Sequence, residues 1–556
     1  MSVAETTPVV VGVARYTHRI QHPDLSDALT PLQLLERTVT RALQDATLKG
    51  ADIDCVATME FWHEMLVPPK TPKHYPNPPK SVATLIGAAE AIEKNHLYAH
   101  PTGGNGPQEL INILGEMIST SKIRSAVICG AEGLAGLKKG LAAGMSLPGV
   151  TEMRRKLSDK KKSQIDTSGK ELPWGDDPGG EPQRFLKSEG MAAYVTRRMA
   201  QTGLVDPTVA YAIFEQAYRK ERYPNVSREQ YQRELARLMS EFSQLAAADP
   251  ANAWDPQART PEEIATPGPG NRYVAFPYTR AMNSFIDVDQ SAAVVLMSLG
   301  EARRHGVPEE KFVFLHAHSD VAEEPYRMLD RPDFTVSPAL RVIRRRLEET
   351  LGEPLSGIKH KEIYSCFPVA VRHAALQLGI PFLHASDICK TGGMQFHGGP
   401  GNNFSTHSIA LMVEILRRDP GSKGLVTSNG GIFSKHSAGV YSTQPCTWVP
   451  RHVEEDQERA KQLFAKLHPV PVKMNDQPSG EATVDLWTVV FDVENKPKRA
   501  IIIGTLTATS ERFIAASAEA DIVKALLERD TFGLPCSVQT TPEGKSTFQL
   551  HVPSRL

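Results

Sequence analysis

The amino-acid sequence predicts an α/β fold in which helices cover a largely parallel β-sheet. One observation is that strand-like apolar runs alternate with amphipathic helices over much of residues 9–443. A second is an internal repeat. A short extended run, a glycine-rich loop, an apolar helix and a buried strand occur at residues 98–130 and again at 391–431. Two such units facing each other would place two loops and two helix N-termini around one cleft.

The first repeat and the segment before it contain short apolar runs that fit buried strands, separated by segments with helical spacing. Small residues in the second helix suit close packing. Strands are expected at residues 9–14, 54–59 and 126–130, and helices at 31–48, 81–92 and 110–118.

Residues 137–273 differ in composition, because they are charged and rich in glycine and proline at their start. Such a segment is expected to be an insertion rather than sheet core, with helices at 191–202, 207–222 and 228–248. Two basic runs, at 154–156 and 160–162, could contact a phosphorylated ligand beside the glycine loops. The alternative is a solvated surface loop.

The second half repeats the alternation and ends in a different pattern. Strands are expected at 287–297, 312–318 and 362–367, and helices at 338–351, 368–378 and 409–416, with another helix starting at 301. A charged helix at 454–467 then precedes alternating strands at 482–492, 499–509, 513–517 and 546–552, with a helix at 522–528. This last part predicts a small antiparallel barrel or sandwich.

Composition excludes several classes of protein. The 556 residues carry a formal net charge of −1, which gives no reason to expect a nucleic acid or a membrane surface as partner. No apolar run approaches the ~20 residues that span a bilayer, and no signal-peptide pattern is seen. The six cysteines form no CxxC pair, so we expect a reducing, cytoplasmic location and no metal framework. Ser554-Arg555-Leu556 loosely resembles a peroxisomal ending, and the alternative is that it has no targeting role.

The two glycine loops are the candidate binding apparatus. Glycines allow close approach of a ligand, and the helix N-termini that follow present N–H groups to an oxyanion or a phosphate. The candidate cofactor-binding residues are Gly103, Gly104, Asn105, Gly106, Gly398, Gly399 and Gly401. His100 and His397 lie just before the loops and could act as acid/base groups or oxyanion donors. The alternatives are structural turns and satisfied core histidines.

Three motifs, in this order, resemble the thiolase superfamily. "DVDQSAAVVLMSLGEARRHG" at 287–306 is similar to the segment that opens the second thiolase half. "YSCF" at 364–367 stands where sterol-carrier-protein thiolases carry "HDCF". "GGMQFHGGPGN" at 392–402 aligns with "GGxxxxGHPxG". More narrowly, the chain resembles type-1 thiolase-like proteins, which carry an extra C-terminal domain like an OB-fold.

The resemblance implies a duplicated five-layer αβαβα fold with an inserted loop domain and a C-terminal OB-like β-barrel. The expected N-terminal half comprises residues 1–136 and 274–300. The expected loop domain, C-terminal half and β domain span 137–273, 301–453 and 454–556.

The resemblance also locates the candidate catalytic residues. The nucleophilic cysteine of thiolases corresponds to Gly103, and a glycine cannot form an acyl-enzyme. The oxyanion-hole histidine corresponds to Gly399, and the cysteine of the "CxG" motif to Ser428. Cys366 matches a cysteine implicated in proton transfer. The candidate catalytic residues are His397, Cys366, Tyr364, His100, Ser428 and Asn429.

The leading hypothesis is a protein of lipid metabolism that binds CoA or acyl-CoA non-covalently. It is similar to acetyl-CoA acetyltransferases but lacks ordinary thiolase turnover. An alternative is a retro-aldolase acting on a 3-hydroxyacyl-CoA, as in the thiolase-like steroid side-chain aldolases, with Tyr364 as acid/base. Tyr364 could equally be an aromatic spacer. A third hypothesis is a non-catalytic scaffold. A homodimer is possible, since thiolases are usually oligomers.

Overall fold

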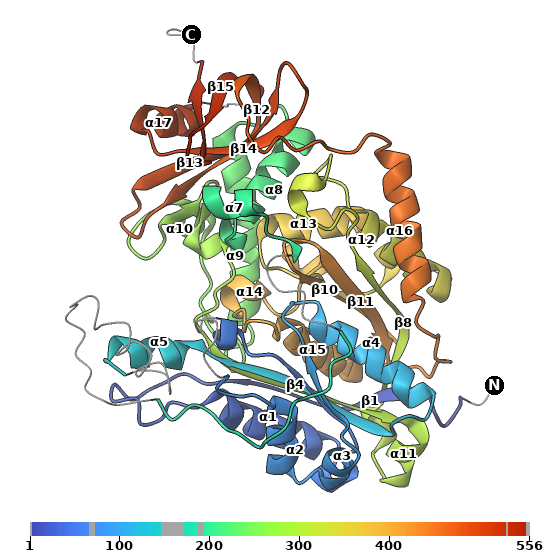
Figure 1. Cartoon of the computed structure of the whole chain (residues 1–556). Helices are drawn as coiled ribbons and strands as arrows, with labels where there is room; N and C mark the ends of the chain where they lie inside the picture. The colour runs from blue at the N-terminus through green and yellow to red at the C-terminus, as the bar shows by residue number, and fades with distance from the viewer. Residues whose placement is uncertain (1–2, 66–72, 146–171, 187–192, 530–531, 552–556) are drawn as a thin grey trace.

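The computed structural model describes residues 3–65, 73–145, 172–186, 193–529 and 532–551. The basic runs at 154–162 and the final tripeptide lie outside the described residues. A nine-stranded sheet runs through the centre of the molecule in the order β3-β2-β4-β7-β1-β8-β11-β10-β9 (Figure 1). No helix of the described chain is long and apolar enough to cross a bilayer.

The first five strands of this order form the N-terminal half. They are β1 Pro8–Thr17, β2 Val56–Met59, β3 Leu97–His100, β4 Ser125–Gly133 and β7 Asp289–Ser298. Helix α1, Pro31–Asp45, covers β1, β4 and β7 and begins at a capping box in which Thr30 and Gln33 cap each other's N–H groups. The single helix predicted at 81–92 is wrong: Gly87 takes φ +76° and separates α2, Pro78–Ile86, from α3, Ala89–Glu93.

The remaining strands form the C-terminal half. They are β8 Val313–Ala322, β9 His360–Glu362, β10 Lys423–Gly430 and β11 Lys435–Ser442. Short pairing of Val9 with Phe314 joins β1 to β8 and connects the two halves. The outer helices are α11 Leu299–Arg304, α12 Pro338–Leu351 and α13 Pro368–Gln377. The strand predicted at 362–367 ends at Glu362, so "YSCF" lies between β9 and α13.

Helices α4, Gly106–Ser119, and α15, Phe404–Arg418, contact each other and strands of both halves. With α1 outside one half and α12 outside the other, the layers alternate αβαβα, which confirms the expected architecture. The prediction of a largely parallel sheet is wrong. Only β2–β3, β2–β4 and β9–β10 are parallel within this sheet, because β7 and β11 return antiparallel to their neighbours.

The segment between the halves carries its own helices. After α5, Leu134–Ala142, come α7 Arg197–Thr202, α8 Pro207–Arg222, α9 Arg228–Ala247 and α10 Pro261–Ala265, and then two short strands, β5 Tyr273–Ala275 and β6 Tyr278–Thr279. Helix α8 is mostly buried and contacts α13 of the C-terminal half. It also contacts the C-terminal sheet, which stands on these helices in Figure 1.

The C-terminal sheet is antiparallel, as predicted, with the order β14-β13-β12-β15-β16. Its elements are β12 Gly480–Phe491, β13 Pro497–Leu506, β14 Arg512–Ser517, α17 Ala520–Glu528, β15 Pro535–Thr540 and β16 Ser546–Leu550. Strand β5 adds to it by pairing Ala275 with Val490, and Phe276 stacks on the buried Trp487. Helix α16, Val453–Leu467, instead packs on α12 and β8.

Candidate functional site

The two glycine loops touch each other directly. The N–H of Gly103 donates to Oδ1 of Asn402 at 3.0 Å, and the Ser405 hydroxyl donates to the Gly104 carbonyl at 2.9 Å. Helices α4 and α15 start from these loops, and neither N-cap side chain, Asn105 or Asn403, caps its helix. The positive ends of both helix dipoles therefore meet where the loops join, which favours negative charge there.

Gly104 is held against two candidate catalytic residues. A Cβ at this position would overlap the Tyr364 hydroxyl and stand 2.6 Å from the Asn429 carbonyl oxygen. Gly106 is similarly enclosed by Met59 and His100. At Gly103, by contrast, a Cβ would meet only the end of the Asn105 side chain closely, at 2.7 Å from Oδ1. Position 104 thus has no room for a side chain. Position 103 opposes one through its φ of +158° and through the movable end of the Asn105 side chain.

Tyr364, Cys366 and Asn429 form one buried cluster. The Asn429 amide donates to the Tyr211 hydroxyl at 2.8 Å and reaches the Cys366 sulfur at 3.8 Å. Burial raises the pKa of Cys366 to about 12 and holds the pKa of Tyr364 well above its ordinary value. Both groups are therefore protonated at neutral pH and can donate, not accept, a proton.

Two polar atoms at the end of β10 have no hydrogen-bond partner among the described residues. They are the hydroxyl of Ser428 and Oδ1 of Asn429, and both are buried. A buried acceptor without a partner is unfavourable by about 1–3 kcal/mol, so such atoms mark where a ligand or water binds. The structure therefore brings Asn429, Tyr364 and Cys366 together beside the first loop, whereas Ser428, the preceding residue of β10, points to the other face of the strand.

His100 ends β3 and is engaged at both ring nitrogens. Nδ1 lies 2.8 Å from the Pro101 carbonyl oxygen, and Nε2 lies 3.1 Å from Oε2 of Glu109 on α4. Burial by itself would raise the pKa of Glu109. The hydrogen bond from His100 and its charge outweigh burial and hold the pKa of Glu109 below its ordinary value. His100 thus fastens the start of α4 to β3.

His397 does not have the equivalent position. It follows the single helical turn α14, Gly393–Phe396, rather than a strand, which corrects the expectation of a short extended run before the second loop. Its Nε2 lies 3.3 Å from Nδ1 of His407 on α15. Burial, with the nearby Arg15 charge, lowers the pKa of His397 to about 3, and that of His407 falls well below its ordinary value. The two rings form a neutral pair.

The glycines of the second loop are fixed from three sides. Gly398 takes φ +105° and a Cβ there would overlap Gln290 of β7. The N–H of Gly399 donates to the Phe285 carbonyl at 2.8 Å. Gly401, at φ +50°, packs on the Glu132 carboxyl group. Burial raises the pKa of Glu132 to about 8.

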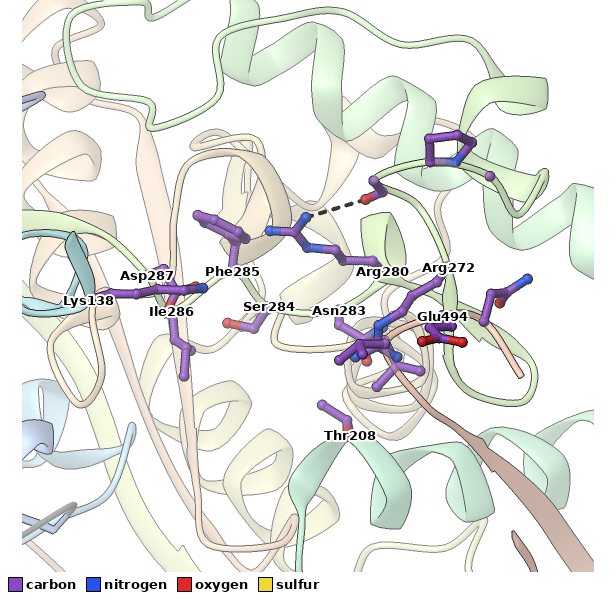
Figure 2. Close-up of a pocket in the computed structure, with 16 residues that line it drawn as sticks. Lys138, Thr208, Arg272, Arg280, Asn283, Ser284, Phe285, Ile286, Asp287 and Glu494 are labelled. Atoms are coloured by element: carbon purple, nitrogen blue, oxygen red, sulfur yellow. Dashed lines mark hydrogen bonds and ion pairs between the residues drawn. The ribbon is translucent and has the colours of Figure 1, made fainter. Parts of the chain in front are cut away.

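Residues 283–287 form one wall of a cavity of about 790 Å³ (Figure 2). The same segment contacts the second loop, because Phe285 accepts the hydrogen bond from Gly399. Within this segment, the Ser284 N–H donates to the Cys366 carbonyl at 3.1 Å, and the Ser284 hydroxyl faces Gly399. The other walls come from residues 268–274 and from the β12–β13 turn at 493–495. The cavity therefore lies between the inserted segment and the C-terminal sheet.

The cavity has a mixed charge with a cationic excess. Arg280 stacks over Phe285, 5.2 Å from the ring centroid, and donates to the Gly270 carbonyl at 3.3 Å. Arg272 donates to the Tyr273 carbonyl at 2.7 Å. Lys138 forms an ion pair with Asp287 on another side (Figure 2). Both guanidinium groups face carbonyl oxygens, which leaves their charge available to an anionic ligand.

Sequence analysis missed this cavity and the role of Tyr211. Tyr211 is separated from Asn429 by 218 residues, and no local pattern distinguishes it from other apolar positions of α8. Arg272 and Arg280 carried a weak signal, since they follow a segment rich in glycine and proline. The basic residues singled out instead, at 154–162, lie outside the described part of the chain.

Comparison with known proteins gives two matches that cover different extents. The family described as the additional C-terminal domain of thiolase-like protein type 1 matches residues 462–543. A solved structure, the monomeric SCP2-thiolase-like protein type 1 from Mycobacterium smegmatis, is 28% identical with a TM-score of 0.77. That similarity covers 99% of this chain and 100% of the other. A search of curated proteins found no match.

Two further solved structures share the fold at lower identity. The Ltp2–ChsH2(DUF35) aldolase is 17% identical, with a TM-score of 0.54 over 80% of this chain and 100% of that one. An acetyl-CoA acetyltransferase from Syntrophomonas wolfei is 15% identical, with a TM-score of 0.52 over 79% and 99%. Both agree with the five-layer core described above.

Proposed function

We propose that this chain, which is similar to SCP2-thiolase-like protein type 1 and matches the additional C-terminal domain of that group, binds CoA or an acyl-CoA without forming an acyl-cysteine. The observation that carries the proposal is the cationic cavity, one wall of which, residues 283–287, contacts the second glycine loop. The ligand would belong to lipid metabolism and would be held non-covalently.

The chemistry of the loops supports binding without thiolase turnover. A nucleophilic cysteine needs a lowered pKa, as thiolates are the attacking species. The thiolase nucleophile corresponds to Gly103, and the thiol in the neighbouring cluster, Cys366, has its pKa raised to about 12. The helix N-termini and backbone N–H groups remain, and these are groups that bind a thioester oxygen.

The cavity suits the phosphorylated part of the ligand. Its volume falls within the roughly 300–1,000 Å³ of small-molecule sites. Arg272 and Arg280 could pair with phosphate oxygens, for which guanidinium groups have suitable geometry. The thioester end would then point past Ser284 toward Cys366 and Gly104.

Calorimetric titration with CoA, acetyl-CoA and a long-chain 3-hydroxyacyl-CoA tests the proposal. We expect micromolar binding to at least one of them. Arg272→Gln and Arg280→Gln should each weaken binding by at least about tenfold, since one charge-assisted hydrogen bond contributes about 1.5–3 kcal/mol. Arg345→Gln is the matched control, because this exposed arginine on α12 does not line the cavity. Absence of binding to all three ligands would favour the scaffold hypothesis instead.

A retro-aldol activity is the second candidate, and the position of Tyr364 favours it. Its hydroxyl lies against Gly104, at the junction of the loops, next to atoms that have no described partner. Because burial raises its pKa, Tyr364 would act as a proton donor, or as a base only after ligand binding changes its surroundings. Tyr364→Phe should abolish cleavage of a 3-hydroxyacyl-CoA while leaving its binding within about twofold. Unchanged cleavage would identify Tyr364 as a spacer.

The oligomeric state and location are further expectations. The Mycobacterium relative is described as monomeric, and the large inserted segment and C-terminal sheet support the same state here, against the predicted homodimer. Light scattering coupled to size exclusion distinguishes 61.0 kDa from twice that mass. A cytoplasmic location stays a prediction.

A further inference from the structure

A cluster of two histidines and a glutamate lies outside the thiolase-like site. His63 and Glu64 belong to the short helical turn Trp62–Met65, and His74 lies ten residues further along the chain. One donor atom from each side chain can be chosen such that all three lie within 4.8 Å of one another. The cysteine pattern gave no reason to expect a metal, and His63-Glu64 with His74 forms no familiar sequence motif.

The donor atoms of both histidines lie close to the Glu64 carboxylate. Nε2 of His63 lies 3.3 Å from Oε1 of Glu64, and Nδ1 of His74 lies 3.6 Å from Oε2. His63 Nε2 and Glu64 Oε2 have no hydrogen-bond partner among the described residues. Ligands of a tetrahedral zinc ion stand about 3.4 Å apart, given metal–ligand distances of about 2.0–2.2 Å. With one donor atom of each side chain within 4.8 Å of the others, a small shift of the side chains would bring the three donors to this spacing.

The cluster is enclosed and already oriented. The side chains of His63, Glu64 and His74 are 0%, 9% and 2% exposed. The His63 ring contacts the rings of Phe61, Tyr75 and Trp174, so its plane is fixed. The Glu64 carboxylate accepts from the N–H groups of His74 and Tyr75 at 2.8 and 3.0 Å. One carboxylate and two imidazoles in an apolar shell leave a negative charge that a cation would balance.

We propose that His63, Glu64 and His74 bind a divalent cation of the zinc class. Two imidazoles and a carboxylate form a known ligand set for Zn²⁺, which takes a fourth ligand from water or substrate. A small cavity of about 10 Å³ borders Glu64 together with Tyr75 and Lys73. That volume is about the space that one water molecule needs, and its lining includes Glu64 but neither histidine, so a water there can hydrogen-bond the carboxylate.

The site would support the second glycine loop. The Trp62 N–H, in the turn that carries two of the ligands, donates to the Glu132 carboxyl group at 2.7 Å. Glu132 in turn packs on Gly401. A cation that fixes the turn therefore fixes one wall of the loop, without touching the cluster around Tyr364.

Zinc titration of the chelator-treated full-length protein tests the proposal. We expect one Zn²⁺ per chain by calorimetry and by elemental analysis after dialysis, with MgCl₂ failing to compete. Bound zinc should raise the Tm of the protein, since a ligand that binds only the folded state stabilises it. A full-length protein that binds no zinc overturns the proposal.

Variants separate this site from adventitious binding. Glu64→Gln keeps an acceptor for the two N–H groups and should weaken zinc binding at least about tenfold, as should His63→Gln. His305→Gln is the control, because His305 also lies between two carboxylates, those of Asp52 and Glu301, and its loss should leave binding unchanged. If both cluster variants bind zinc like the wild type, or if only His305→Gln loses it, the proposal is wrong.

Cobalt substitution keeps the test valid if a variant folds poorly. Co²⁺ in a four-coordinate nitrogen and oxygen site absorbs visible light far more strongly than hydrated Co²⁺. The wild-type protein should give this absorption, and zinc should displace it. Absorption like that of hydrated Co²⁺ alone would contradict the proposed ligand set regardless of how the variants behave.

Discussion

The two glycine loops look alike in sequence but are anchored by different chemistry. The first is fastened by a charge-assisted pair, in which His100 at the end of β3 meets Glu109 on α4. The second is fastened by two neutral imidazoles, His397 and His407, in an apolar setting. The two copies therefore share a glycine loop followed by a helix, while the backbone before the loop and the side chains that support each copy differ.

Substitution of Gly104 should have the largest effect. Gly104→Ala places a methyl group onto the Tyr364 hydroxyl and the Asn429 carbonyl, and we expect the free energy of unfolding to fall by about 3 kcal/mol. Chemical denaturation measures this. Gly357→Ala is the control, since a Cβ there meets no other atom within 4 Å. Similar stability of the two variants would show that the loops are not joined as described.

As pH falls, the second loop should lose stability before the first loop does. Burial lowers the pKa of His397 from an ordinary 6.5 to about 3. As pH falls below about 6.5, His397 is therefore protonated in the unfolded chain and stays neutral in the folded chain. Between pH 7 and pH 5 this group alone should lower the free energy of unfolding by about 2 kcal/mol. His397→Gln should lose that part of the pH dependence. An unchanged pH dependence would contradict a neutral, buried His397.

The first loop should lose stability only at a lower pH than the second loop. The pKa of Glu109 is below its ordinary 4.5 in the folded protein, so its contribution to stability is present above that pH and is lost as pH falls further. Glu109→Gln should leave the stability change between pH 7 and pH 5 as in the wild type and flatten the change below about 4.5. Denaturant titrations of both variants across pH measure the difference between the loops.

The contact between the loops should contribute the smallest effect. Asn402→Ala removes the acceptor of the Gly103 N–H, and Ser405→Ala removes the donor to the Gly104 carbonyl. Each should lower the free energy of unfolding by about 1 kcal/mol. In a double-mutant cycle, coupling well above about 0.5 kcal/mol would show that the two bonds form one cooperative contact, and additivity would show independent ones.

Helices with a clear start signal in the sequence were predicted at their observed bounds. Helices α8 and α12 were expected at their observed bounds, because a proline at N1 and a capping side chain mark their starts. Short strands such as β5 and β15 were missed, since a few residues carry no periodicity. Strand direction in the central sheet was also wrong, because whether β7 and β11 run parallel to a neighbour depends on the path of the chain between halves.

The candidate site was predicted as a set of segments rather than as a geometry. The meeting of the two glycine loops followed from the repeat, and the resemblance placed Tyr364, Cys366 and Asn429 near them. The hydrogen bond from Asn429 to Tyr211 depends on the inserted segment folding over the loops, which no repeat encodes. The His63 cluster escaped notice because its ligands are common surface residue types until burial brings them together.

Strand β5 of the inserted segment is part of the C-terminal sheet, and this limits where the chain can be truncated. Ala275 pairs with Val490, and the Thr488 hydroxyl bonds the Phe276 carbonyl across 212 residues of sequence. A gene shortened before β12 would leave Phe276 without the indole on which it stacks and would remove one wall of the cavity. The inserted segment and the C-terminal sheet therefore form one folding unit. A screen of chain fragments for soluble, folded protein should recover the two together or not at all.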